Sequence, residues 1–161
     1  MASSSERERE GSTKEGRVRA PEAYVIQEVQ GFVDAAWNAG TSGGGFGCIF
    51  KDRNDRFLHQ VSSNRSNVGS ALVAEALAVK AGLKAARSMG LSNLIIRSDS
   101  RSLIMAITSH ERIVEAQGVM FDIYHLCNAF SSVSFRYIPR ENNAEVDALA
   151  KAALRRLPNS G

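Results

Sequence analysis

The chain has 161 residues, 43% of them hydrophobic, which is the size of one domain with enough apolar residues for one core. No apolar run approaches the roughly 18 to 20 residues that cross a bilayer, so we expect no membrane span. Cys48 and Cys127 are too few for a disulfide framework or a four-cysteine zinc site, and we expect free thiols with no disulfide-linked partner. A net charge of +3 leans mildly toward polyanionic partners.

Residues 1–24 alternate charged and small polar side chains, which predicts a disordered charged tail. The stretch lacks the apolar segment of a secretory signal, and its glutamates are atypical of an organelle transit peptide. We therefore expect a cytoplasmic or nuclear protein, and we expect a monomer. From Val29 onward, basic residues outnumber acidic ones by four.

The first half of the body predicts three strands joined by short turns, at residues 29–38, 46–52 and 57–62. The glycine-rich segment 39–45 predicts a hairpin turn. It differs from a phosphate-binding loop because it lacks the Gly-Lys-Ser/Thr ending and precedes a strand. Connections this short favour an antiparallel meander.

The second half alternates helices and strands. The predicted helices are 70–88, 100–108, 112–129 and 143–157, and the predicted strands are 93–99 and 133–138. Gly90 stands where a helix C-cap glycine would, and Ser100 is a plausible N-cap. The resulting order, β-β-β-α-β-α-α-β-α, predicts one α/β domain over residues 29–157. It has a mixed five-stranded sheet with helices on both faces.

Four acids occupy positions where the surrounding pattern favours apolar residues. Asp34 lies inside the first strand, Glu75 on the alanine-rich side of its helix, Asp99 at the end of an apolar strand, and Asp147 within the apolar pattern of the last helix. Each has a simpler alternative. Asp34 could pair with a buried arginine, Asp99 could cap the next helix, and the other two could be partly exposed. The end of a buried strand beside the first strand is nevertheless a usual ligand position in open α/β sheets.

Four clustered carboxylates repel one another unless cations compensate them. Magnesium prefers oxygen ligands, and two such ions about 4 Å apart can cleave a phosphodiester. Without these four acids the body has eight more basic than acidic residues, which suits a nucleic acid around an acidic centre. The three histidines are widely separated, and neither a zinc motif nor a Gly-x-Ser-x-Gly elbow is present.

Residues 31–157 resemble the type 1 ribonuclease H domains. They resemble more closely the plant group of ribonuclease H-like domains related to the ends of non-LTR retroelement reverse transcriptases. The matching segments, in order, are VDAAWN, AEALAVKAGLKAA, IIRSDSRSLI and FRYIPRENNAEVDALAKAA. The resemblance implies a ribonuclease H-like fold that cleaves the RNA strand of an RNA–DNA hybrid internally. It also implies two Mg²⁺ or Mn²⁺ ions, and products with a 5′-phosphate and a 3′-hydroxyl.

The resemblance also assigns roles to residues. Asp34, Glu75, Asp99 and Asp147 become the catalytic metal ligands. Asp34 would bridge both ions, Glu75 and Asp99 would hold the ion on the leaving-group side, and Asp147 would hold the ion that binds the attacking water. The candidate nucleic-acid contacts are Arg101, Arg140, Ser100 and the backbone of Ala35, with Lys80 and Lys84 as weaker candidates.

The sequence departs from the family pattern in three places. Ala35 replaces the glycine that usually follows the first aspartate, and its methyl group narrows the approach of a phosphate or ribose. The loop 138–143 lacks the histidine of many members, so Arg140 or Glu141 would have to substitute, and the basic protrusion of some bacterial members is missing. A catalytically weak nucleic-acid-binding or protein-interaction module therefore stays open. A 3′–5′ exonuclease is disfavoured because Ala36 stands where its second acid would be.

Overall fold

The computed structural model describes residues 27–158, and the predicted tail at residues 1–24 lies outside that range. The strands are β1 (Val29–Asn38), β2 (Gly43–Lys51), β3 (Phe57–Arg65), β4 (Asn93–Ser98) and β5 (Ser132–Tyr137). The helices are α1 (Ala71–Ser88), α2 (Arg101–Thr108), α3 (Gln117–Cys127) and α4 (Ala144–Arg155). Two short 3₁₀ helices, η2 (Val114–Ala116) and η3 (Arg140–Asn143), precede α3 and α4.

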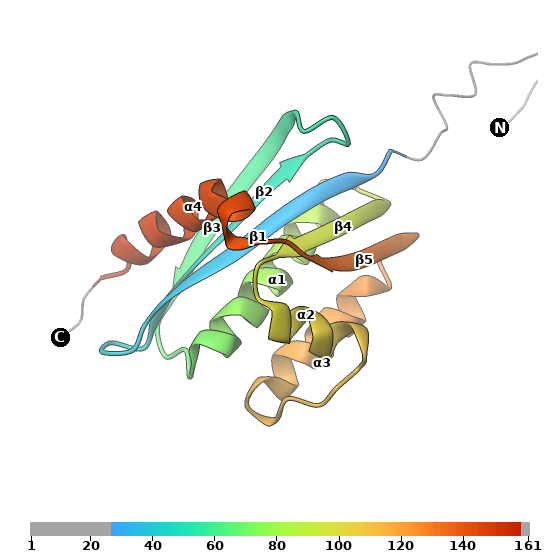
Figure 1. The fold of residues 1–161 in the computed structure, drawn as a ribbon. Coiled ribbons are helices and arrows are strands. Elements are labelled where there is room, and N and C mark those ends of the chain that lie inside the picture. Colours follow the sequence, from blue (N-terminus) through green and yellow to red (C-terminus); the bar gives the residue numbers. More distant parts are fainter. Residues whose placement is uncertain (1–26, 159–161) are drawn as a thin grey trace, which may run out of the picture.

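The five strands form one sheet in the order β3-β2-β1-β4-β5, with β1 in the centre. The β1–β2 and β2–β3 pairs are antiparallel, and the β1–β4 and β4–β5 pairs are parallel. Helix α4 covers β1, β2 and β3 on one face, while α1, α2 and α3 lie on the other (Figure 1). The predicted mixed sheet with helices on both faces is confirmed.

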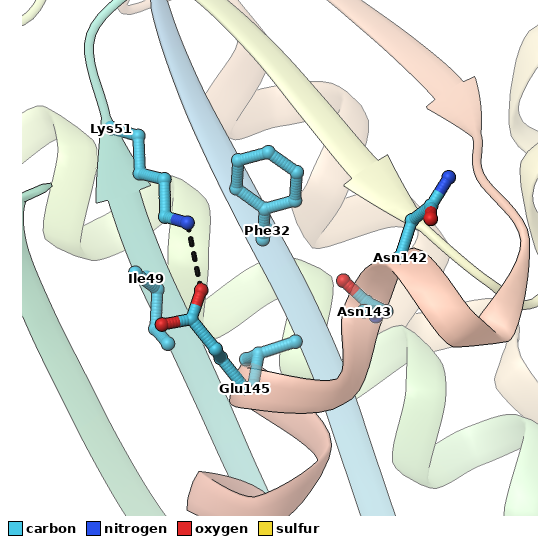
Figure 2. Close-up of a pocket in the computed structure, with 7 residues that line it drawn as sticks. Phe32, Ile49, Lys51, Asn142, Asn143 and Glu145 are labelled. Atoms are coloured by element: carbon cyan, nitrogen blue, oxygen red, sulfur yellow. Dashed lines mark hydrogen bonds and ion pairs between the residues drawn. The ribbon is translucent and has the colours of Figure 1, made fainter. Parts of the chain in front are cut away.

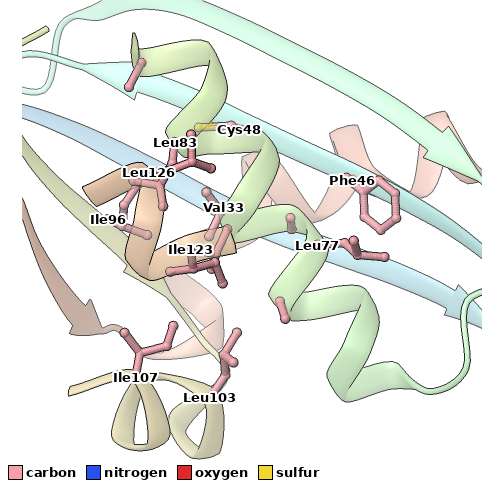
Figure 3. Packing of buried hydrophobic residues seen from close by; sticks show 14 of the residues in the cluster. Val33, Phe46, Cys48, Leu77, Leu83, Ile96, Leu103, Ile107, Ile123 and Leu126 are labelled. Atoms are coloured by element: carbon pink, nitrogen blue, oxygen red, sulfur yellow. The ribbon is translucent and has the colours of Figure 1, made fainter. Parts of the chain in front are cut away.

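The main core lies between the sheet and α1, as Figure 3 shows. Helix α1 is buried on more sides than its predicted alanine stripe implied, because α3 packs against it opposite the sheet. Val79 and Leu83 are fully buried, whereas Ala81 and Ala85 are only partly buried. The predicted C-cap glycine, Gly90, has a φ of 75°, which ends the helix in the left-handed region.

The predicted glycine-rich turn is shorter than expected. The turn occupies residues 39–42, where the Asn38 side chain accepts hydrogen bonds from the backbone N–H groups of Gly40 and Thr41. Residues 43–45 belong to β2 instead. A Cβ atom on Gly45 would lie 2.3 Å from the Ala150 carbonyl oxygen of α4. The glycines are therefore strand residues against which a helix backbone packs directly.

Other boundaries differ in detail. Helical structure in the predicted 112–129 helix is limited to η2 and α3, and β3 extends three residues beyond the predicted 57–62. The last helix buries Val146, Ala150 and Ala153, while Leu149 and Ala152 are partly buried.

Both cysteines are free, with Cys48 buried and Cys127 half-buried. Within residues 27–158, no helix combines the length and the apolar character needed to cross a membrane.

The contact between Gly45 and α4 generates a stability prediction. Gly45→Ala should destabilise the fold by about 3 kcal/mol or more, because the backbone of α4 cannot yield as a side chain can. Gly118→Ala is the matched control. A Cβ on Gly118 meets no atom within 4 Å, and alanine in a helix should stabilise by up to about 1 kcal/mol. Urea unfolding measures both, and equal midpoints for the two variants would contradict the prediction.

Candidate metal centre

The parallel pairing of β1 with β4 brings Asp34 and Asp99 together. Paired residues run from Val29 with Leu94 to Phe32 with Arg97, and the same offset places Asp34 level with Asp99 just beyond the last pair. Residues at one level on neighbouring parallel strands point to the same face of the sheet. Asp34 is only 3% exposed on the central strand.

Two helix starts bring the other two acids to this point. The Ser70 side chain accepts a hydrogen bond from the Val73 N–H and caps α1, so Glu75 lies near the first turn of that helix. The Asn143 side-chain amide donates a 3.0 Å hydrogen bond to the Val33 carbonyl and ties the start of α4 to β1. Asp147, in the first turn of α4, is thereby directed toward the same region.

Asp34, Glu75 and Asp99 each offer a carboxylate oxygen, and these oxygens all lie within 4.8 Å of one another. Asp147 lines the same pocket, which has a volume of about 340 Å³. The lining residues are Asp34, Ala35, Trp37, Ala71, Ala74, Glu75, Asp99, Arg140, Asp147 and Lys151. The four acids predicted from the sequence therefore share one pocket, and three of them form its closest group.

The crowding of these acids disfavours their charged forms. Burial and, to a smaller extent, the charge of Asp99 together raise the pKa of Asp34 to about 7. Burial also raises the pKa of Glu75 to about 9, with contributions from Asp34 and Asp99, while Arg140 acts in the opposite direction. The pocket without a cation is thus a strained arrangement of acids.

A divalent cation fits this donor set. The Glu75 Oε1 atom is buried and has no hydrogen-bond partner, which is costly for a carboxylate oxygen unless a cation or proton compensates it. Among residues 27–158 the ion pairs include no arginine partner for Asp34, and the N-cap of α2 is Ser100. Glu75 and Asp147 are partly exposed, as their simpler alternative expects, although one Glu75 oxygen is buried. Hard oxygen ligands at this spacing suit Mg²⁺ or Mn²⁺.

The predicted nucleic-acid contacts separate into two groups. Arg140 and Ala35 line the acid pocket. Arg101 lies with its guanidinium 4.2 Å from the ring centre of Tyr137, and Ser100 is the N-cap residue of α2, without a side-chain capping bond. Neither lines the pocket. Lys80 is bonded to Asp122 at 2.8 Å, so it has a structural partner.

Trp37 and Lys151 line the pocket but are not among the site residues predicted from the sequence. The Trp37 indole N–H donates to the Val68 carbonyl at 2.9 Å, which fixes the segment before α1. Lys151 lies 3.0 Å from an Asp147 oxygen. Its position four residues after Asp147 on a helix was a usable signal, because such residues are neighbours.

A second, much smaller cavity lies at the start of α4. Figure 2 shows Phe32, Ile49 and Asn143 around it, with the Lys51–Glu145 ion pair at its side. Its volume of about 20 Å³ suits about one water molecule and excludes a nucleotide. The acid pocket is the candidate functional site because it holds the three carboxylates within 4.8 Å of one another.

The sheet order and the acid pocket together define a ribonuclease H-like protein. The chain belongs to the reverse transcriptase-like family, whose model matches residues 32–153. No curated protein matches it in sequence. The plant and retroelement part of the resemblance stays a prediction.

Solved structures share the fold. Ribonuclease H1 from Halobacterium salinarum NRC-1 has a TM-score of 0.74 at 22% identity, covering 80% of this chain and 98% of that chain. LC11 ribonuclease H1 in complex with an RNA/DNA hybrid has a TM-score of 0.73 at 21% identity, covering 80% and 97%. The PFV ribonuclease H domain has a TM-score of 0.66 at 15% identity, covering 83% and 98%.

The raised pKa values predict how stability without metal depends on pH. Between the ordinary pKa values of 3.8 for Asp34 and 4.5 for Glu75 and their raised values, the folded chain binds more protons than the unfolded chain. Stability should therefore fall as pH rises from about 4 to 9. Glu75→Gln should flatten this fall and raise stability at pH 9.

Urea unfolding in EDTA at pH 5, 7 and 9 measures the effect. Glu141→Gln, an exposed acid on the loop before α4, is the control and should keep the wild-type slope. If the stability of the wild type relative to Glu75→Gln rose with pH, the raised pKa values would be contradicted.

Proposed function

We propose that the chain hydrolyses the RNA strand of RNA–DNA hybrids with divalent ions held by Asp34, Glu75, Asp99 and Asp147. The observation that carries the proposal is the group of three carboxylates within 4.8 Å, one of which has a buried, unpartnered oxygen. Bound Mg²⁺ or Mn²⁺ would supply a water of lowered pKa and stabilise the leaving oxygen.

The positions of the acids support different tasks. Asp34 interacts electrostatically with both Asp99 and Asp147, which suits a ligand shared between two ions. Glu75 from α1 and Asp99 from the end of β4 would together hold one of these ions. Asp147 is partly exposed, at 35% of its side chain, and would hold the ion nearest to solvent.

The balance of charge in the pocket makes phosphate binding dependent on metal. Four carboxylates face two cationic side chains, Arg140 and Lys151. The ionised pocket without metal repels a phosphate, and a divalent ion reduces or reverses that repulsion. Arg140 lies beside Glu75 and suits a contact with the substrate backbone, which the metal ions would draw into the pocket.

The choice of a hybrid as substrate rests on the fold and on the site. LC11 ribonuclease H1, which has this fold, was solved in complex with an RNA/DNA hybrid. The backbone at Ala35 borders the pocket beside Asp34, where it could contact a ribose 2′-hydroxyl and so favour RNA over DNA.

Two observations favour a second candidate, a nucleic-acid-binding module with weak catalysis. Ala35 lines the pocket where the family pattern has glycine, and no histidine lines it among the described residues. A positioned general acid–base contributes about a hundredfold or more, so turnover should be slow even in the enzyme reading. The two readings differ in whether the unmodified chain cleaves a hybrid at all.

The test is incubation of the protein with labelled RNA–DNA hybrid, double-stranded RNA and double-stranded DNA, with Mg²⁺ or with EDTA. We expect slow, metal-dependent cleavage of the RNA strand of the hybrid only. Asp34→Asn should reduce cleavage at least about a hundredfold, because it disables both ions. Asp147→Asn should reduce it less, since water can replace a ligand near solvent.

Glu111→Gln, an exposed acid after α2 that does not line the pocket, is the control in this assay and should cleave like the wild type. Cleavage that persists in Asp34→Asn would point to a contaminant. Hybrid binding without any cleavage by the wild type would reject the enzyme and favour the binding module.

A further inference from the structure

The acid pocket contains a cation that the proposed chemistry does not use. Lys151 lines the pocket with the four carboxylates, and its ammonium nitrogen lies 3.0 Å from Asp147 Oδ2. The Lys151 side chain is 59% exposed, so its head lies at the mouth of the pocket. One candidate metal ligand is therefore already engaged by a cation of the chain itself.

The stability of α4 does not explain this ion pair. An exposed pair at this helical spacing contributes little to the stability of a helix. Helix α4 is held to the sheet by the buried residues Val146, Ala150 and Ala153, and by direct packing of its backbone on Gly45. Removing the Lys151 charge should thus leave the fold intact, so its effects on the pocket can be measured.

A divalent ion at Asp147 and the Lys151 ammonium would compete for the same carboxylate oxygen. The two cations also repel each other at this range, even in a water-like medium. The four-carbon stem of lysine is flexible, so the ammonium can leave Asp147 without any movement of the helix. After leaving Asp147, the ammonium would lie at the mouth of the pocket, where a substrate phosphate would enter.

We propose that Lys151 is an exchangeable counter-ion: it neutralises Asp147 in the metal-free pocket and is displaced by the metal to contact a substrate phosphate. The exchange keeps the mouth of the pocket from carrying unpaired negative charge before metal arrives. It also supplies a cation for the phosphate only after metal has bound. The phosphate contact rests on the proposed function, whereas the competition with metal does not.

The first test is Mn²⁺ binding to the protein without nucleic acid, measured by electron paramagnetic resonance or calorimetry. Lys151→Gln should bind Mn²⁺ about threefold to tenfold more tightly, because a competing charge is lost. Arg155→Gln, an exposed basic residue one turn further along α4, is the matched control and should change affinity less than about twofold. Lys151→Arg keeps the charge and should stay near the wild type.

A double variant locates the effect. Asp147→Asn should weaken Mn²⁺ binding. In the Asp147→Asn background, Lys151→Gln should increase Mn²⁺ affinity much less than it does in the wild type, because residue 147 no longer carries the charge for which the two cations compete. An Mn²⁺ affinity in Lys151→Gln that matched that of Arg155→Gln would overturn the inference. So would a full gain in the Asp147→Asn background.

The second test is binding of a 2′-O-methyl RNA–DNA duplex, which keeps the phosphates. With Mg²⁺, Lys151→Gln should lower the slope of log affinity against log salt by about one, and with EDTA it should not change the slope. An unchanged slope with Mg²⁺ would overturn the phosphate contact. A wild type that binds Mn²⁺ as expected but cleaves no hybrid would refute the proposed function and leave the exchange with metal in place.

Discussion

The packing of a helix backbone on a glycine-lined strand is the constraint on which the rest of the structure depends. Gly45 and Gly47 of β2 leave no side chain between the strand and α4, so the helix approaches the sheet at backbone distance. This approach, with the hydrogen bond from Asn143 to the Val33 carbonyl, fixes the start of α4 relative to β1. Asp147 is directed into the pocket as a result. A side chain on either glycine would push α4 away from the sheet and move Asp147 away from the pocket. The packing of α4 on the sheet therefore also determines which acids reach the site.

The buried acids of the pocket destabilise the fold that surrounds them. Asp34 and Glu75 are taken out of water beside other acids, and the raised pKa values record the electrostatic cost. The cost is offset by the hydrophobic core between the sheet and α1, where residues such as Val33 and Ile96 are fully buried. Val33 and Asp34 are adjacent on β1 and point to opposite faces, so β1 supplies one residue to the core and the next to the pocket.

The sequence predicted the sheet, the helix order and the four acids of the pocket, because each depends on a local pattern. The alternation of strands, the alanine-rich period of α1 and an aspartate inside a strand are all visible without a structure. The glycines at 43–45 misled the boundary of β2, because glycine favours a turn unless a distant helix requires its missing side chain. Lys151 and Trp37 were missed for a related reason. A lysine on a helix and a tryptophan on a strand look ordinary until the fold shows which pocket they line.

The alignment of Asp34 with Asp99 at one level of the sheet limits which parts of such a domain can change in length. The two acids are far apart in the chain, yet their meeting depends only on the register of β1 and β4. Insertions in the connections between these strands change the length of the path but not the level at which the strands align. A slip of one residue within β4 would instead turn Asp99 to the opposite face of the sheet. Loops around this fold are thus free to diverge in length and composition, while β1 and β4, whose register sets the level of the two acids, can accept substitutions but no change in length.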